Sequence, residues 1–482
     1  MAQKSLKANA FFTIIKAFMN IIFPIISFPY ASRILLPEGI GRVNFANSFV
    51  EYFVMFAQLG IGWYASREAA RIRENKQQLN KLCREILAIN FCSTAIAYIL
   101  LFISIFTIEK FADYKILIII CSTKVLFTTI GINWIFTANE EYAYITIRQS
   151  IFQALSLLFL FLFVKSKDDY LIYAGIGVFA NVGANTFNLF YAHKFINIFE
   201  KTPLDLKKHL KAIIIFFGIA IAGKINAALD ILMLGFMLND VAVGYYSAAI
   251  KINRLVKEMI TSAICSLMPR SSYYIENNKI EEYKAVITSA CDATYFFCIP
   301  ASAGMFFLVE PLITLFSGEA FLPAAPSMKI LSISLIGTCS CSFLENLIIT
   351  PQRKEKFILI AQVIAALCNI VLNAILIVHF EVFGAAVATT IIEFLLPLVI
   401  LFPSFKYLKS LDNLVGIGKA LTGTLLMYAA IYLFCSEIQN NFLKIVMTVV
   451  TGCSVYALSE LVLRNKTALI LFGIISKKIK KA

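Results

Sequence analysis

The feature that most constrains this chain is a succession of long apolar runs, each able to cross the roughly 30 Å hydrocarbon core of a membrane as a helix. Only structures that satisfy their own backbone hydrogen bonds can span lipid, and for unbroken apolar runs that structure is the helix. Fourteen runs qualify, at about residues 8–31, 40–63, 85–108, 116–137, 143–164, 171–193, 212–238, 242–269, 285–309, 324–349, 357–379, 383–403, 415–435 and 445–463. We therefore predict an all-α polytopic membrane protein with about 14 transmembrane helices.

Composition agrees with a membrane protein. Hydrophobic residues make up 60% of the 482 residues and charged residues only 15%, more apolar surface than a soluble core can bury. The net charge of +14 does not indicate nucleic acid, because the basic residues follow the loops. The first run lacks a small-residue cleavage site and is expected to be a retained helix. The 11 cysteines lie mostly in apolar runs, without a CxxC pair, and are expected to pack as apolar residues.

The loops predict the orientation in the membrane. Alternate connections, counted from the N-terminus, carry 27 Lys and Arg, whereas the opposite set carries 6. Basic loops stay in the cytoplasm, so both termini are expected there. The tail ALILFGIISKKIKKA (residues 468–482) is expected to lie on the inner membrane surface with its lysines near anionic head groups.

An internal repeat divides the chain. Superposing Gly41 on Gly244 places Ala46 on Ala249 and Glu51 on Arg254, and both segments follow a long helix and a tight outer loop. We expect two six-span lobes of the same orientation, with binding between them. The predicted parts are an N-lobe (1–194), a cytoplasmic linker (195–211), a C-lobe (212–403), and a final part with two spans and a basic tail (404–482).

The run from Ile213 to Leu238 carries two deep charges. Lys224 lies about 18 Å from either end, and its side chain spans only about 6 Å, so it cannot reach the interface. Asp230 lies about 240° further around the helix, so the two charges do not pair with each other. An unpaired charge at that depth costs about 2.5–3.5 kcal/mol, so each needs a partner from another segment. Two interpretations of Lys224 stay open: a structural interhelical ion pair, or a cationic, water-filled cavity for an anion.

Other intramembrane charges are candidates for the same cavity. Lys251 and Arg254 share one helical face with Glu258, which leaves open an internal Arg254–Glu258 pair or two cations that face the cavity. Glu51 occupies the repeat-equivalent position of Arg254, so a gating pair between them is predicted. The remaining candidates are Lys124 and Lys16 as cavity cations, and Asp230 and Glu393 for coupling or gating.

Motifs for catalysis are absent from the sequence. It contains no P-loop, no GxSxG and no HExxH, and its three histidines are scattered. An enzyme and a metal site are therefore not expected.

Four segments together resemble Wzx-type polysaccharide-repeat-unit flippases: residues 29–73 (PYASRILLPEGIGRVNFANSFVEYF and onward), 133–151 (NWIFTANEEYAYITIRQSI), 228–272 (ALDILMLG, VGYYSAAIKI and LMPRSS) and 351–394 (PQRKEKFILIAQVIAAL through FGAAVATTIIEF). Residues matching family positions are Arg33, Glu140, Arg148, Asp230, Arg270 and Glu393. The sequence departs from the family at Ile231, where a charged residue is common.

The resemblance implies the fold of the MOP exporters, with two six-helix lobes around a central cavity. It also implies a flippase in the cytoplasmic membrane of a bacterium that moves oligosaccharide linked to undecaprenyl pyrophosphate from the inner to the outer leaflet by alternating access. The lipid bilayer and the polysaccharide polymerase machinery are the implied partners. No cofactor is expected, and coupling to H⁺ or Na⁺ is left open.

Three other classes of function are alternatives to a repeat-unit flippase. A multidrug or lipid II exporter would share the fold, although a drug-cation exporter favours an acidic cavity. A membrane glycosyltransferase or polymerase needs an acidic catalytic motif or a long outer loop, and the longest predicted outer loop is 310–323. A passive scaffold would not need Lys224 at the middle of a span.

Overall fold

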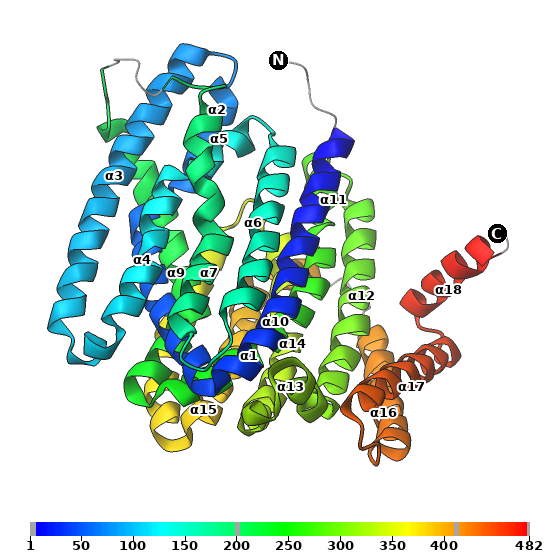
Figure 1. Ribbon diagram of the computed structural model, residues 1–482. Coiled ribbons are helices and arrows are strands. Elements are labelled where there is room, and N and C mark those ends of the chain that lie inside the picture. The colour runs from blue at the N-terminus through cyan, green and yellow to red at the C-terminus, as the bar shows by residue number, and fades with distance from the viewer. Residues whose placement is uncertain (1–5, 198–202, 409–413, 480–482) are drawn as a thin grey trace. The chain divides into compact units, whose positions relative to one another are not determined.

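The computed structural model describes residues 6–197, 203–408 and 414–479, and nearly all of them are helical (Figure 1). No β-strand occurs in those ranges. The chain divides into two compact units, Met1–Gly244 and Tyr245–Ala482. The division falls within α10, so that α9 belongs with the first unit, and the predicted lobe boundaries stay a prediction.

In the first unit, the long helix α1 packs against α3, α4, α6 and α9, and α7 packs against α4 and α6 (Figure 1). The helices of this unit are α1 (Leu6–Gln58), α2 (Ile61–Ile72), α3 (Lys76–Thr107), η1 (Glu109–Tyr114), α4 (Lys115–Ile130), α5 (Asn133–Ala138), α6 (Tyr142–Phe163), α7 (Tyr170–Val182), η2 (Gly183–Phe187), α8 (Asn188–Ala192), α9 (Lys207–Met237) and the first turn of α10 (Asp240–Cys265).

In the second unit, α14 packs between α12 and α15, and α16 lies beside α17 (Figure 1). After α10, the helices are α11 (Met268–Glu276), α12 (Ile280–Phe307), α13 (Val309–Ser317), η3 (Glu319–Ala324), α14 (Ala325–Phe343), the π-helical turn η4 (Leu344–Ile349), α15 (Lys356–Leu408), α16 (Leu414–Cys435), α17 (Asn441–Val462) and α18 (Lys466–Ile479).

The predicted spans correspond to helices. Among the described residues, eight helices are long and apolar enough to cross a membrane, and α9, bent by 55°, makes a ninth. Two of the eight hold two predicted spans each, because α1 is interrupted at Leu36 and α15 at Glu381. The remaining three predicted spans correspond to α4 and α7, which are shorter, and to α10, which is more polar. The predicted all-α membrane fold with about 14 spans is confirmed.

The break in α1 has a local cause. Leu36 has φ 59° and precedes Pro37. Proline disfavours helical geometry in the residue before it, lacks a backbone N–H, and clashes with the carbonyl four residues back. The predicted outer loop at 32–39 is therefore reduced to one non-helical residue, and the two spans on either side of it form one kinked helix.

The glycines that identified the repeat lie where two helices cross. A methyl group at Gly41 would overlap the carbonyl oxygen of Asp240, and one at Gly244 would overlap the carbonyl oxygen of Pro37. The Asp240 carboxylate also forms an ion pair with Arg42 (3.1 Å). Only residues without a Cβ allow this approach, so the repeated glycine marks a packing position.

The two units also share a type of helix-ending turn. Glu140 (φ 57°) follows α5, and Arg353 (φ 57°) follows η4. In each turn, the backbone N–H of the residue with positive φ donates to the carbonyl three residues earlier. The N–H of the next residue donates to the carbonyl five residues before it, which is a Schellman arrangement with a non-glycine residue at the positive-φ position. Glu140 pairs with Arg73 (2.8 Å) and Arg353 with Glu276 (2.8 Å), so the charges are reversed between the units.

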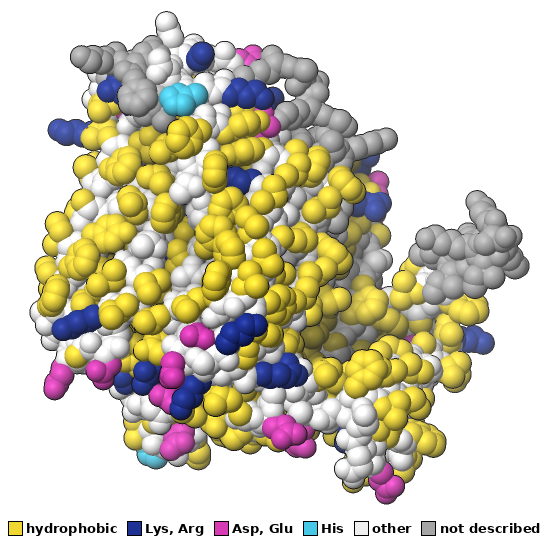
Figure 2. Space-filling view, viewed as in Figure 1, with side chains coloured by type: hydrophobic (Ala, Val, Ile, Leu, Met, Phe, Trp, Pro, Cys, Tyr) yellow, Lys and Arg dark blue, Asp and Glu magenta, His cyan; other side chains and the backbone are white. Residues whose placement is uncertain are grey.

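The outward faces of the helices are apolar. Figure 2 shows hydrophobic side chains covering the visible face, and large exposed residues recur along α3 and α6, among them Phe91, Ile99, Phe102, Ile151 and Leu158. Contiguous apolar surface of this extent is not stable in water. The described helices are therefore suited to contact with lipid acyl chains.

Candidate functional site

A cluster of charged and polar side chains lies inside the first unit, and we call it the Glu51 cluster: Glu51, Lys224, Lys124 and Asn47. The Lys224 Nζ lies 2.9 Å from Glu51 Oε2, and the Lys124 Nζ lies 3.8 Å from Glu51 Oε1. Lys124 also donates a hydrogen bond to Asn47 Oδ1 (2.7 Å). Three helices, α1, α4 and α9, thus direct polar groups to one point.

Local sequence explains how the helices supply these groups. Asn47 and Glu51 are four residues apart on α1 and so share a face. On α9, a bend separates the segments Lys207–Ile225 and Ala228–Met237, and Lys224 lies at the end of the first segment, next to this bend. The partner of Lys224 is Glu51 on α1, and the sequence analysis expected a partner on another segment. The interhelical pair is one of the two interpretations that the sequence left open, and it is the one that this conformation contains.

The Glu51 cluster has one carboxylate for two ammonium groups and therefore carries a net positive charge. The side chains are 36% exposed for Glu51, 27% for Lys224 and only 10% for Lys124. Two cations cannot both be neutralised by one carboxylate, and desolvation makes the remaining charge costly. An anion that reached the cluster could compete with Glu51 for Lys224. Binding of an anion there stays a prediction.

A second cluster lies inside the second unit, and we call it the Glu393 cluster: Glu393, Lys257 and Thr338. Glu393 Oε1 accepts from Lys257 Nζ (2.6 Å), and Glu393 Oε2 accepts from Thr338 Oγ1 (2.7 Å). A methyl group at Gly337 would meet the backbone carbonyl of Glu393, so α14 and α15 approach closely here. This cluster holds one cation and one anion and is neutral.

The other predicted residues are not all gathered at these clusters. Arg254 pairs with Glu258 four residues further along α10 (2.6 Å), as the alternative interpretation allowed. Lys251 is half-buried on α10, and Asp230 is buried on α9 with 3% exposure. Lys16 is half-buried on α1, within electrostatic range of Arg148. Coupling between Glu51 and Arg254 stays a prediction.

Sequence reasoning missed three members of the clusters. Lys257 is a fourth charge on the helix that carries Lys251, Arg254 and Glu258. It lies to the side of the face that those three residues share. Asn47 and Thr338 are uncharged polar residues within apolar runs, and such residues are too common to be singled out. A search for amide and hydroxyl residues within one turn of a buried acid would have found Asn47.

Of the family-matched positions, three arginines make local contacts, and the first, Arg33, donates to the carbonyl of Pro29 (2.8 Å). Arg148 donates to Asn133 (3.1 Å) and its guanidinium lies over the Tyr144 ring. Arg270 donates to the Tyr274 hydroxyl (3.0 Å). Within the described ranges, no group of three or more His, Cys, Asp or Glu is placed to hold a metal ion.

Comparison with known proteins gives consistent results for sequence and fold. The family described as "Polysaccharide biosynthesis protein" matches residues 6–275. A candidate O-antigen transporter of Escherichia coli (strain K12) is 23% identical over 396 residues, covering 80% of this chain and 92% of its own length. A candidate flippase of low-salt glycan biosynthesis from Haloferax volcanii, Agl15, is 24% identical over 36% of each chain.

Among solved structures, the lipid II flippase MurJ in an inward closed conformation superposes with a TM-score of 0.75, at 20% identity, over 94% of this chain and 99% of its own. An inward-facing multidrug transporter of the MATE family, within the MOP superfamily, superposes with a TM-score of 0.62, at 13% identity, over 82% of this chain and 96% of its own. At these identities the likeness shows a shared fold.

Proposed function

Since the chain belongs to the polysaccharide biosynthesis protein family, we propose that it is a flippase for oligosaccharide linked to undecaprenyl pyrophosphate. It moves this substrate from the inner to the outer leaflet of the bacterial cytoplasmic membrane by alternating access, with both termini in the cytoplasm. The family match confirms the resemblance inferred from sequence, and it covers residues 6–244 of the first unit and continues to residue 275.

The relatives support a transported glycan. The names of the bacterial and archaeal relatives refer to O-antigen transport and to a glycan flippase, and that of the structural neighbour refers to lipid II. All of these names describe transport, which supports a non-enzymatic role. These names support our proposal that the substrate of this chain is a lipid-linked oligosaccharide.

The observation that carries the proposal is the net positive charge of the Glu51 cluster. A pyrophosphate cannot cross bare hydrocarbon, because transfer of its charges out of water is far too costly. In the proposed cycle, the pyrophosphate displaces the Glu51 carboxylate from Lys224, while Lys124 stays held by Asn47. The prenyl tail remains in lipid and the glycan passes through water. Glu51, Asp230 and Glu393 are the acids that could exchange H⁺ or Na⁺ during the cycle.

Replacement of Lys224 tests the proposal. Lys224→Met removes the cation, so export should fall to background while the protein still inserts. Lys224→Arg keeps the charge with a different head-group geometry and should retain part of the activity. The measurement is outer-leaflet glycan per unit of inserted protein in cells that lack the chromosomal gene. Lys284→Met is the control, since Lys284 pairs with Glu281 on an exposed helix end (3.0 Å). Normal export by Lys224→Met would reject the anion-binding role.

Orientation has its own test. Single cysteines at Gln78 and Ala320, both at exposed positions, are introduced after replacement of the exposed native cysteines, Cys92, Cys265 and Cys453. A membrane-impermeant thiol reagent should label Gln78→Cys only in inverted vesicles and Ala320→Cys in intact cells. The reverse pattern would place the termini outside the cytoplasm.

A further inference from the structure

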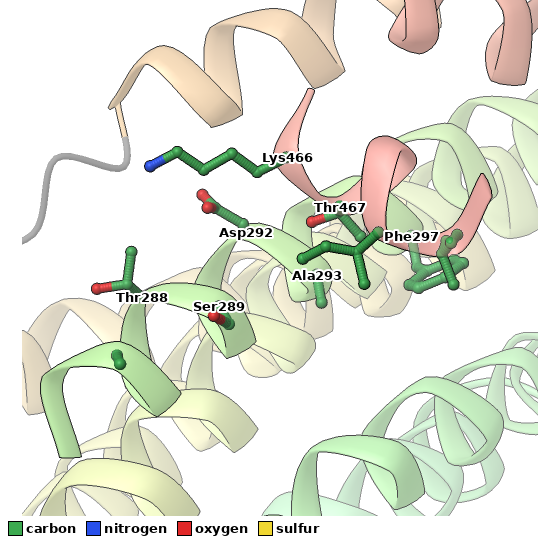
Figure 3. A pocket seen from close by; sticks show the side chains of 10 residues that line it. Thr288, Ser289, Asp292, Ala293, Phe297, Lys466 and Thr467 are labelled. Carbon is green, nitrogen blue, oxygen red and sulfur yellow. The ribbon is translucent and has the colours of Figure 1, made fainter. Parts of the chain in front are cut away.

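A cavity of about 450 Å³ lies in the second unit, between α12 and α18 (Figure 3). Its volume falls in the range of sites for small molecules. It is lined by Ala285, Thr288, Ser289, Asp292, Ala293, Phe297, Lys466, Thr467, Ile470 and Leu471. Neither the Glu51 cluster nor the Glu393 cluster contributes to it, so the proposed transport mechanism does not use it.

The two charged residues of the cavity are not paired with each other. The Asp292 carboxylate and the Lys466 side chain lie on the same side of the cavity (Figure 3), within electrostatic range of each other but not in an ion pair within 4.0 Å between these two described residues. Asp292 Oδ1 is buried without a hydrogen-bond partner, and it lies against Gly416 of α16. Lys419 also lies within electrostatic range, so this carboxylate lacks a hydrogen-bond donor rather than nearby positive charge, and a buried acceptor without a donor is costly.

The position of Lys466 is set by its surroundings. Asn465 caps α18 by accepting from the backbone N–H of Thr467 (2.9 Å). Lys419 of α16 donates to the carbonyl of Arg464 (3.1 Å) and so attaches the start of α18 to the bundle. Lys466, in the first turn of α18, is exposed and available to an anion.

One side of the cavity is apolar. Phe297 is 48% exposed, Ile470 58% and Leu471 37%, and all three line the cavity. The hydroxyl-bearing residues Thr288, Ser289 and Thr467 also line it. A ligand that fits must carry a cation, an anion and an apolar tail. It must also lie near the membrane surface, because α18 follows the last span.

We propose that this cavity binds one membrane glycerophospholipid whose head group carries a primary ammonium. The ammonium donates to Asp292, the phosphate accepts from Lys466, and an acyl chain lies along Phe297, Ile470 and Leu471. A lipid with a purely anionic head would place negative charge beside Asp292. A quaternary ammonium lacks the N–H donors that a carboxylate oxygen needs. A prenyl pyrophosphate has no cation at all.

The test uses full-length protein in detergent micelles and phosphatidylethanolamine with a fluorophore on an acyl chain, so that the head group is intact. Unlabelled phosphatidylethanolamine, phosphatidylcholine and phosphatidylglycerol compete for the labelled lipid. Phosphatidylethanolamine should compete at least about tenfold better than the other two, as expected for charge-assisted hydrogen bonds. Asp292→Asn and Lys466→Gln should each weaken its binding about tenfold.

Two further variants keep the test decisive. Ser289→Phe fills the cavity without a change of charge and should also abolish preferential binding, even if Asp292→Asn fails to fold. Glu437→Gln removes an exposed acid of the same unit and should have no effect. Equal competition by the three lipids, or full binding by Ser289→Phe, would overturn the proposal. So would displacement by undecaprenyl phosphate in preference to phosphatidylethanolamine, which would assign the cavity to the carrier. Because binding is measured without transport, the outcome is independent of the flippase proposal.

Discussion

The two units differ in how each neutralises its central carboxylate. Glu51 of the first unit faces two lysines, whereas Glu393 of the second faces one lysine and a threonine hydroxyl. The first arrangement keeps a positive charge that an anionic substrate can use. The second pairs its one lysine with Glu393 and has no excess of positive charge, because Glu345 also lies within electrostatic range of that lysine. Repeated topology therefore does not imply repeated chemistry, and we expect anion binding at the first cluster rather than at the second.

The largest effect on stability is expected from removing the charge of the carboxylate at the centre of each cluster. Glu51→Gln leaves two close ammonium groups without an acid and should lower the free energy of unfolding by about 2–3 kcal/mol. Glu393→Gln leaves one ammonium group and should cost about 1–2 kcal/mol. Both are measured by denaturant unfolding in mixed micelles. A greater loss for Glu393→Gln would show that the second cluster carries the larger uncompensated charge.

A smaller effect is expected from disturbing the packing that forms the neutral cluster. Gly337→Ala places a methyl group against the backbone of Glu393 and should destabilise the second unit by about 1–2 kcal/mol, as overpacking does. Gly304→Ala, in the same unit, meets nothing within 4 Å and should be neutral or stabilising by up to about 1 kcal/mol. If Gly337→Ala were as stable as the wild type, close helix contact would not position the Glu393 cluster.

The smallest effect concerns the turns, where the units carry reversed charges. Arg73→Gln and Glu276→Gln each remove one exposed ion pair and should cost only about 0.2–1 kcal/mol. Raising the salt concentration to about 1 M should erase the difference, because the Debye length falls to about 3 Å. The check is unfolding at low and high salt. A salt-independent loss would mean that these residues contribute through packing instead.

Much of the fold followed from local information. The apolar runs predicted where helices lie, and the Leu36–Pro37 pair explains the break within α1. The depth of Lys224 required a partner on another segment, and one is present. Three of the candidates, Lys224, Lys124 and Glu51, lie together in the structure, and their roles in transport stay a prediction. Arg254 instead pairs with Glu258 on its own helix.

The sequence by itself determined that the chain spans a membrane and that its buried charges need partners, because a helix in lipid satisfies its own backbone and leaves only side chains to be neutralised. It did not determine which partner each charge takes. Glu51 and Lys224 are 173 positions apart, and the repeat predicted Arg254 rather than Lys224 as the partner of Glu51. Tertiary packing decided the choice: the bend in α9 and the approach of α1 and α4 bring two lysines to one carboxylate, and Gly337 lets Thr338 reach the other.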